Sequence, residues 1–347
     1  MASVSVVIPV YNRADLLPRC LSSVEQQTFA DWECLIIDDE STDTSLQVAR
    51  SFSARDARFR PLVRTRSRKG AAACRNEGVE RAKGEFILFL DSDDVLSPAC
   101  LAMRAGILAE HSSSDFAVFQ TGCFYDAPGD SRMVWNIPKS EPDLLRFLRL
   151  DVPWSIMGPI WRRSALLRIG GFDESLPGWQ DWQVHVTALL AGLSYFRSDA
   201  CIDCFCCISG ADKVSSKAST LAHLRPKAEF LDRLLESRAS RLAADPPLRN
   251  ACAGLLWYLI VQLQEQGCLW EALRLWRRLR KRGFIGFRMW VERSGGACDA
   301  RKTRWKHCMV VRPAVARVNP SRPEDVALRV SGCCIGTISC VSATEAG

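Results

Sequence analysis

The chain has 347 residues, 48% hydrophobic and 24% charged, which is enough apolar material for one large globular domain or two smaller ones. Its longest apolar run, Ala251 to Val261, is far shorter than the ~18 residues that cross a bilayer, which excludes a membrane-spanning helix. The net charge of +7 is concentrated at the back, because the stretch from Glu265 to Val330 holds sixteen lysines and arginines against six acidic residues.

The chain opens on a short apolar run that has no basic residue before it and is soon interrupted by Pro9 and Asn12. A secretory signal peptide needs a basic start and a longer apolar stretch, so we expect a cytoplasmic protein. In that compartment the sixteen cysteines are expected to be reduced thiols, most of them in apolar surroundings.

The first third of the chain alternates short apolar runs with segments of helical periodicity. This alternation predicts an α/β fold, a mostly parallel sheet with helices on both faces. Helical patterns alone follow from about Leu221 to Phe287. In chain order the expected elements are a strand at 4–8, a helix at 16–24, strands at 33–37 and 61–64 around a helix at 43–53, a helix at 70–82, a strand at 86–90, a helix at 98–110 and a strand at 115–120.

Three polar clusters come directly after predicted strands. Tyr11-Asn12 follows the first strand, Asp38-Asp39 follows the second, and 91–94 follows the most apolar strand in the chain. Ligands of parallel sheets bind beyond the carboxyl ends of the strands. The three clusters are therefore expected to line one cleft.

The cluster at 91–94 places Asp91, Asp93 and Asp94 at the mouth of a core strand. Three carboxylates are costly there unless a cation joins them, and hard oxygen ligands suit Mg²⁺ or Mn²⁺ bridging phosphate oxygens. The alternative is a solvated acidic turn or a helix cap. An EF-hand loop does not fit, because Leu96 occupies the sixth position, where the turn needs glycine.

Two further features suit a nucleotide. Asp39 can accept a hydrogen bond from a base or a ribose, although the same stretch also offers capping residues for the next helix. Gly70 opens a predicted helix, whose N-terminus with basic neighbours suits a diphosphate, and a solvated basic turn is the alternative. The basic neighbours are Arg66, Arg68, Lys69 and Arg75.

Asp181 lies between two tryptophans, Trp179 and Trp182. Aromatic faces pack on sugar rings, and a carboxylate between them can deprotonate a hydroxyl. A helix N-cap with core tryptophans is the other interpretation. The cysteine run 201–207 suggests zinc, but no matching Cys/His pair lies at finger spacing and the run is also typical of a buried strand, so metal binding there stays open.

Together these blocks resemble the family 2 glycosyltransferases, which have the GT-A fold, and in particular those of bacterial cell-surface polysaccharide assembly. The segment 6–12 resembles that family's opening strand, and 36–43 its Asp-Asp-Gly-Ser-Thr-Asp signature. The segment 75–94 is similar to its middle block. Finally, 169–181 resembles the Gly-Gly-Phe-Asp-Glu motif that leads to the family's Glu-Asp pair.

The resemblance implies an inverting transfer of a sugar from a nucleoside-diphosphate sugar, with a UDP-sugar favoured, to a hydroxyl of a saccharide or lipid-linked acceptor. It implies Mn²⁺ or Mg²⁺ ligated by Asp93 of a DXD motif, and Asp181 as the catalytic base. The acceptor would contact Trp179 and Trp182. The nucleotide-sugar site would consist of Pro9, Tyr11, Asp39, Gly70, Arg75, Asp91 and Ser92.

The chain departs from the family pattern at four places. Arg68 stands where many members have an asparagine. Glu40 replaces a glycine, which requires a negative φ at that position. Gln180 replaces a glutamate but leaves Asp181 intact. Many members carry Arg and His on the strand after the acceptor helix, where this chain has 205–208. Two alternatives follow: some of the help for the leaving diphosphate is lost, or Lys213 or Lys217 supplies it.

The resemblance also divides the chain. We predict a GT-A domain at 1–215, with a nucleotide-binding half at 1–122 and an acceptor-side half at 123–215. A helical region at 216–293 and an irregular tail at 294–347 follow.

The basic amphipathic segment 270–284 can lie on an anionic membrane surface or pack on the preceding helices and solvate its arginines. We expect no nucleic-acid partner, since no recognised module accompanies the charge. Two other functions stay open. One is a nucleotidyltransferase, although such enzymes usually have a glycine-rich loop where Tyr11 stands, and the other is an inactive GT-A scaffold.

Overall fold

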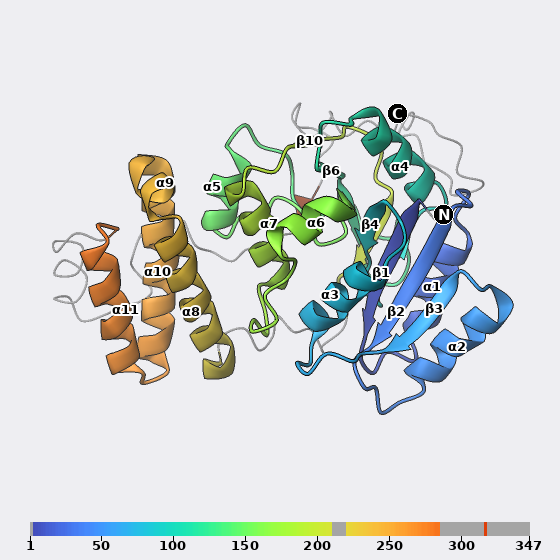
Figure 1. The fold of residues 1–347 in the computed structure, drawn as a ribbon, viewed down its shortest axis with the longest axis horizontal. Helices are drawn as coiled ribbons and strands as arrows, with labels where there is room; N and C mark the ends of the chain where they lie inside the picture. Colours follow the sequence, from blue (N-terminus) through green and yellow to red (C-terminus); the bar gives the residue numbers. More distant parts are fainter. Residues whose placement is uncertain (1–2, 210–219, 285–315, 318–347) are drawn as a thin grey trace, which may run out of the picture.

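The computed structural model describes residues 3–209 and 220–284 and the pair 316–317. Its centre is a seven-stranded sheet in the order β10-β6-β9-β4-β1-β2-β3 (Figure 1). Pairing is parallel except at β9, which runs antiparallel to β4 and β6, so the predicted mostly parallel sheet is confirmed. The strands are β1 (Val4–Val10), β2 (Trp32–Asp38), β3 (Phe59–Val63), β4 (Phe86–Phe89), β6 (Phe116–Val118), β9 (Pro159–Arg162) and β10 (Tyr195–Arg197).

A second, smaller sheet has the order β12-β8-β7-β11-β5. Apart from a strand within 201–207, the sequence does not predict this sheet, because none of its strands exceeds four residues and such short runs show no clear periodicity. Its strands are β5 (Val95–Leu96), β7 (Thr121–Phe124), β8 (Met133–Val134), β11 (Cys204–Cys207) and β12 (Ala316–Arg317).

The strands at the middle of the large sheet are its most buried part. Every residue of β1 and β2 is buried, which requires cover on both faces and explains why these strands read as continuous apolar runs. The helices of this part of the chain are α1 (Leu17–Glu25), α2 (Ser45–Arg55), α3 (Ala71–Arg81), α4 (Cys100–Glu110), α5 (Asp143–Leu148), α6 (Arg163–Ile169) and α7 (Gln180–Leu190).

Pro9 lies inside β1, although the sequence predicts that it ends the strand. A proline cannot donate to a sheet ladder and is therefore unusual in a central strand. Here β4 ends its pairing at Val7, whose carbonyl accepts from Leu90 N, so the side of β1 on which the Pro9 amide would donate has no strand to receive it. On the other side Pro9 stays in register with Ile37 of β2.

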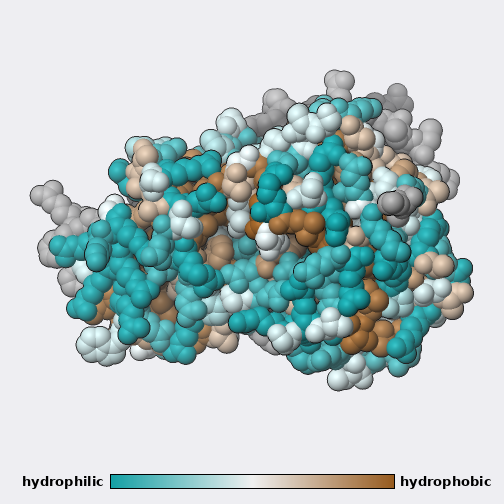
Figure 2. Space-filling model, viewed as in Figure 1, coloured by the Kyte–Doolittle hydropathy of each residue, from teal (hydrophilic) through white to brown (hydrophobic). Residues whose placement is uncertain are grey.

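Helices α8 to α11 form a separate group beside the sheet domain, with α10 packed against α5 and against the other three (Figure 1). Figure 2 shows mostly hydrophilic side chains over α11. Within the described residues, no helix combines the length and hydrophobicity that crossing a membrane requires. The helices are α8 (Leu221–Ser237), α9 (Ala239–Ala244), α10 (Pro246–Glu265) and α11 (Leu269–Lys281).

The predicted division at 215 and 293 stays a prediction, and of the tail only 316–317 falls within the described residues. The sheet does not follow the expected boundary at 122. Strand β9, from the acceptor-side half, lies between β4 and β6 of the nucleotide-binding half, so the two halves share one sheet.

Candidate active site

The three polar clusters meet at one edge of the large sheet, as the sequence predicts. Strands β4, β1 and β2 are adjacent and parallel, with Val10 opposite Asp38 and Val7 opposite Phe89. Their carboxyl ends therefore lie side by side. The segments that follow them bring Tyr11, Asp39 and Asp91 to the same edge.

After β1 the chain turns sharply at Asn12, whose φ is +51°. The Asn12 side chain explains this turn, since its Oδ1 accepts from Thr42 N at 2.8 Å while its backbone N donates to Ser41 Oγ at 3.0 Å. The turn after β1 is thus bound to the turn after β2. Tyr11, next to it, is 52% exposed at the rim, where it is free to cover a flat ring.

Asp39 is buried and both of its carboxylate oxygens are occupied. Oδ1 accepts from Arg64 Nε at 2.5 Å, and Oδ2 accepts from Gly70 N at 2.8 Å. Gly70 has a φ of +114°, which only glycine adopts without strain, and it directly precedes α3. Asp39 therefore fixes the loop that starts the helix. Arg64, which directly follows β3, is not among the predicted site residues, although its place at a strand end is a signal that could have found it.

Glu40 contradicts the expectation of a negative φ. Its φ is +62°, in the left-handed region that the family's glycine would occupy without strain. The side chain is tied down by ion pairs with Lys69 and with Arg64, whose Nη2 lies 3.3 Å from Glu40 Oε1. The left-handed turn is thus kept without the glycine.

The basic residues around Gly70 do not act as one group. Arg66 forms ion pairs with Glu80 and Glu174, Lys69 pairs with Glu40, and Arg68 is exposed. A groove of about 710 Å³ is lined by residues that include Arg66 and Arg68 but not Asp39, Asp91 or Asp181, and it is distinct from the edge described above.

Among the basic residues around Gly70, Arg75 is the one that contacts Asp91 and the start of α7. It is 4% exposed, and its Nη2 donates to Asp91 Oδ1 at 2.6 Å while its Nη1 donates to Gln180 Oε1 at 2.9 Å. Its Nη1 also lies 3.8 Å from Asp181 Oδ1. One guanidinium thus joins the end of β4 to the start of α7, and brings Asp91 and Asp181 into one site.

The three acidic residues after β4 differ in burial: Asp94 is buried, whereas Asp91 and Asp93 are half-buried. Asp94 is 3% exposed and its Oδ1 accepts from Cys207 N at 2.8 Å, so it anchors the loop to β11. Burial raises the pKa of Asp94 well above its ordinary value, and the charges of Asp93 and Asp91 raise it further. Ser92 is buried beside them. The loop therefore concentrates negative charge that a cation would relieve.

A divalent ion fits this loop in one particular way. Within the described ranges, no three His, Cys, Asp or Glu side chains are grouped to hold a metal by themselves. Mg²⁺ and similar ions commonly use only one or two carboxylates and complete their shell with substrate phosphates and water. Asp93, with Asp91 beside it, suits an ion of that kind and not a metal enclosed by protein ligands.

Asp181 lies in the first turn of α7, directly after Trp179 and Gln180. Its side chain keeps 37% of its surface exposed, so it faces the site and not the core. Desolvation raises the pKa of Asp181 to about 6, Asp91 adds to the rise, and Arg75 opposes it. A carboxylate with a pKa near neutrality that is open to the cleft suits a general base.

The two tryptophans around Asp181 have different environments. Trp182 is 3% exposed and its Nε1 donates to Phe147 O at 2.6 Å, which makes it a core residue. We therefore withdraw it as an acceptor contact. Trp179 is half-buried, with a φ of +63° and the Lys227 Nζ 4.8 Å from its ring centroid. It remains available beside Asp181.

The strand at 204–207, the second one after α7, carries no basic residue. It is β11, where Cys204 and Cys207 are buried and Cys206 is half-buried, as expected for a strand. The cysteines at 201, 204, 206 and 207 are thiols that form no disulfide, and they form no metal-binding group with other described residues. Lys213 and Lys217, one of the two alternatives for help with the leaving diphosphate, lie outside the described residues.

Comparison with known proteins agrees with this geometry. The chain superimposes on the crystal structure of S. aureus TarS 1-349 in complex with UDP-GlcNAc with a TM-score of 0.54 and 21% sequence identity, covering 84% of this chain and 92% of that one. The chain thus has the GT-A fold, with the site at the carboxyl edge of its central sheet.

Residues 5–170 match the family model described as Glycosyl transferase family 2, so the chain carries a domain of that family. It is 36% identical over 180 residues to the O-antigen biosynthesis protein RfbC of Myxococcus xanthus, covering 51% of this chain and 14% of that protein. It is 38% identical over 111 residues to an Escherichia coli protein, UDP-Glc:alpha-D-GlcNAc-diphosphoundecaprenol beta-1,3-glucosyltransferase WfgD, covering 32% of this chain and 43% of that protein. The chain thus spans less than half the length of these two relatives.

Proposed function

We propose that this protein transfers a sugar from a nucleoside-diphosphate sugar to an acceptor hydroxyl, with inversion at the anomeric carbon, in polysaccharide or glycolipid assembly. The observation that carries the proposal is the Arg75 bridge. It places a carboxylate suited to a donor, Asp91, and a carboxylate suited to a base, Asp181, on either side of one buried guanidinium.

The nucleotide would lie along the carboxyl edge of the sheet. Tyr11 offers an exposed ring, and the fixed loop at Asp39 and Gly70 offers a rigid wall for the base. Ser92 and Asp91 lie at the next strand end, where the ribose and diphosphate would follow. The WfgD relative is named for UDP-Glc, which favours a UDP-sugar as donor.

The transfer follows from the position of Asp181. Its carboxylate would accept the proton of the acceptor hydroxyl while that oxygen attacks the anomeric carbon from the face opposite the diphosphate. The bond between the carbon and the diphosphate oxygen breaks as the new glycosidic bond forms, and no covalent enzyme intermediate is needed. A Mn²⁺ or Mg²⁺ ion held by Asp93 would neutralise charge on the departing diphosphate.

The acceptor is proposed to be a saccharide or a lipid-linked saccharide, and the WfgD relative is named for a diphosphoundecaprenol acceptor. Helix α11 supports contact with an anionic membrane. Trp270 is 79% exposed, and Arg274, Arg277 and Lys281 are exposed on the same side at helical spacing. We call these four residues the α11 stripe. It is proposed to lie on the lipid surface from which the acceptor is taken.

The test of donor binding is calorimetric titration of the protein with UDP, GDP and dTDP, with and without Mn²⁺. We expect one nucleotide, UDP, to bind in a metal-dependent way, and Asp93→Ala to abolish that dependence. Asp31→Ala is the matched control, since Asp31 is an exposed acid directly before β2, at the opposite edge of the sheet. If no nucleotide binds under any condition, the proposed function is wrong and an inactive relative is left.

A further inference from the structure

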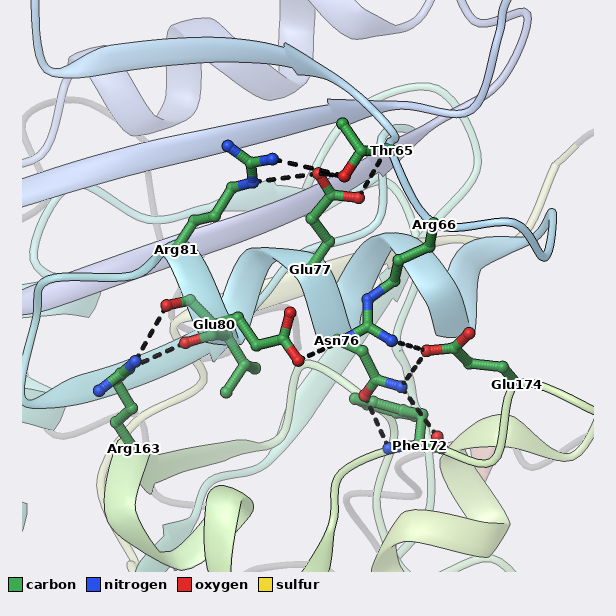
Figure 3. Close-up of polar contacts among 10 residues, drawn as sticks. Thr65, Arg66, Asn76, Glu77, Glu80, Arg81, Arg163, Phe172 and Glu174 are labelled. Carbon is green, nitrogen blue, oxygen red and sulfur yellow. Dashed lines mark hydrogen bonds and ion pairs between the residues drawn. The ribbon is translucent and has the colours of Figure 1, made fainter.

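A second set of contacts connects α3 to the segment that precedes α7 (Figure 3). Asn76 follows Arg75 in sequence, but its side chain contacts Phe172, in the segment before α7, and not Asp91. Its Nδ2 donates to Phe172 O at 2.9 Å, and its Oδ1 accepts from Phe172 N at 2.9 Å. One amide thus satisfies both backbone groups of Phe172, as a neighbouring strand would.

Glu174 extends these contacts. Its Oε1 accepts from Asn76 Nδ2 at 2.8 Å and also pairs with Arg66, which in turn pairs with Glu80 of α3 (Figure 3). Arg66 belongs to the loop that ends at Gly70, the residue held by Asp39. The loop at the nucleotide edge and the segment before α7 are therefore joined by side chains and not only by packing.

The close approach of the two segments is specified by a glycine. Gly171 has a φ of +68°, and a Cβ placed on it would lie 2.4 Å from Asn76 Oδ1. Any other residue would displace the Asn76 amide from Phe172. The contact between α3 and this segment therefore depends on a glycine at position 171, directly before the Phe172 backbone that Asn76 binds.

The same segment is fixed to α7 at its other side. Asp173 N donates to Gln183 Oε1 at 2.8 Å, and Gln180 Nε2 donates to Leu176 O at 3.1 Å. A displacement of the segment would therefore move the first turns of α7. Asp181 lies between those two contacts.

We propose that Asn76, Arg66 and Glu174 are positioning residues that hold the segment 171–180 on α3 and so set the place of Asp181 relative to the donor. This rests on the proposed function only in naming what Asp181 does. Two neighbouring residues of α3 would then have different roles. Arg75 contacts the site directly, and Asn76 holds the segment that precedes Asp181.

The test compares Asn76→Ala and Glu174→Gln with Arg163→Ala. Arg163 is the matched control because its side chain also binds α3, through Nε to Val79 O at 2.8 Å and Nη2 to Glu80 O at 3.0 Å, and not the segment 171–180 (Figure 3). The activity readout is release of UDP from UDP-glucose, UDP-galactose or UDP-GlcNAc with water as acceptor. The structural readout is amide hydrogen exchange of peptides covering 171–183.

We expect Asn76→Ala and Glu174→Gln to lower kcat by about 10-fold to 100-fold, because a misplacement of about 1 Å has that effect on an oriented reaction. UDP affinity should stay unchanged, exchange over 171–183 should accelerate, and the acidic limb of the pH profile should move to lower pH as Asp181 becomes hydrated. Arg163→Ala should change none of these four quantities.

The proposal is overturned if both variants keep wild-type exchange over 171–183, or if they lose UDP affinity in parallel with kcat. It is also overturned if Arg163→Ala gives the same changes, since the effect would then be general destabilisation. If the wild-type protein neither binds UDP nor releases it from any donor, the proposed function fails, and the exchange comparison alone decides whether the segment is held as inferred.

Discussion

Asp181 combines exposure to the cleft with a pKa raised to about 6, and this predicts a pH dependence. The deprotonated carboxylate is the form that accepts a proton, so the transfer rate should rise as pH increases through about 6 and level off above it. Asp181→Asn should lower kcat by about 10²-fold or more and leave UDP affinity intact. A rate profile of UDP release against pH, with calorimetry of the variant, checks both. A profile that is flat through this region would contradict the role.

The left-handed backbone of Glu40 predicts that replacing it by glycine and by alanine changes the free energy of unfolding by different amounts. The left-handed φ costs a residue with a side chain about 1–2 kcal/mol, whereas the ion pair to Lys69 is exposed and screened by solvent and contributes little. Glu40→Gly removes the strain and the pairs, whereas Glu40→Ala removes only the pairs. We expect the glycine variant to exceed the alanine variant in free energy of unfolding by about 1 kcal/mol, measured by urea denaturation. Equal stability of the two would show that the turn is not strained.

At the scale of elements, Gly170 and Gly171 form a matched pair at the end of α6. Both have positive φ, but a Cβ on Gly170 meets nothing within 4 Å while one on Gly171 meets Asn76. Gly170→Ala should therefore show the backbone strain alone, about 1 kcal/mol. Gly171→Ala should add a further loss of about 1–3 kcal/mol from overpacking. Thermal denaturation of the two variants measures the difference, and equal losses would argue against the close approach.

Helix α11 predicts a salt-dependent membrane interaction. Replacing Arg274, Arg277 and Lys281 by glutamate should abolish sedimentation with phosphatidylglycerol vesicles at low salt, because each cation near an anionic surface contributes about 1 kcal/mol. A matched triple replacement of exposed cations on the sheet domain should leave sedimentation unchanged. Wild-type protein that stays in the supernatant would rule out the α11 stripe as a lipid contact. The matched set is Arg50, Lys83 and Arg132.

Much of this element structure can be predicted from the sequence, because β1, β2 and β4 are continuous apolar runs with polar residues directly after them. Asp39, Asp91 and Asp181 follow from that reasoning and from the family resemblance. Periodicity cannot show which basic residue reaches the cleft. Only the family resemblance singles out Arg75, and only the packing of α3 and of the loop before it shows that Arg75 contacts Asp91 while Arg66 contacts Glu174. The sequence pattern likewise cannot show that Trp182 is buried, because its indole nitrogen donates to the carbonyl of Phe147, which is distant in sequence.

At the scale of the whole molecule, Arg104 joins the two sheets. It is fully buried on α4, with Nε donating to Asp203 Oδ2 at 2.7 Å, just before β11, and Nη1 donating to the carbonyl of Gly158 at 3.2 Å, just before β9. Removing one partner of a buried ion pair leaves an uncompensated charge, at a cost of about 3–5 kcal/mol. Arg104→Met should lower the free energy of unfolding by that amount, measured by denaturant titration. The paired change Arg104→Met with Asp203→Leu should recover part of it, and no recovery would show that the carbonyl contacts dominate.

The position of β9 between β4 and β6 has a consequence for synthesis on the ribosome. Strands β4 and β6 leave the exit tunnel before β9 exists, so the edge of β4 stays open while the following residues are translated. An apolar strand with an unpaired edge is a template for intermolecular pairing. The nascent chain is therefore expected to need a chaperone, or slow dilution during refolding, until Pro159–Arg162 arrives and closes the sheet.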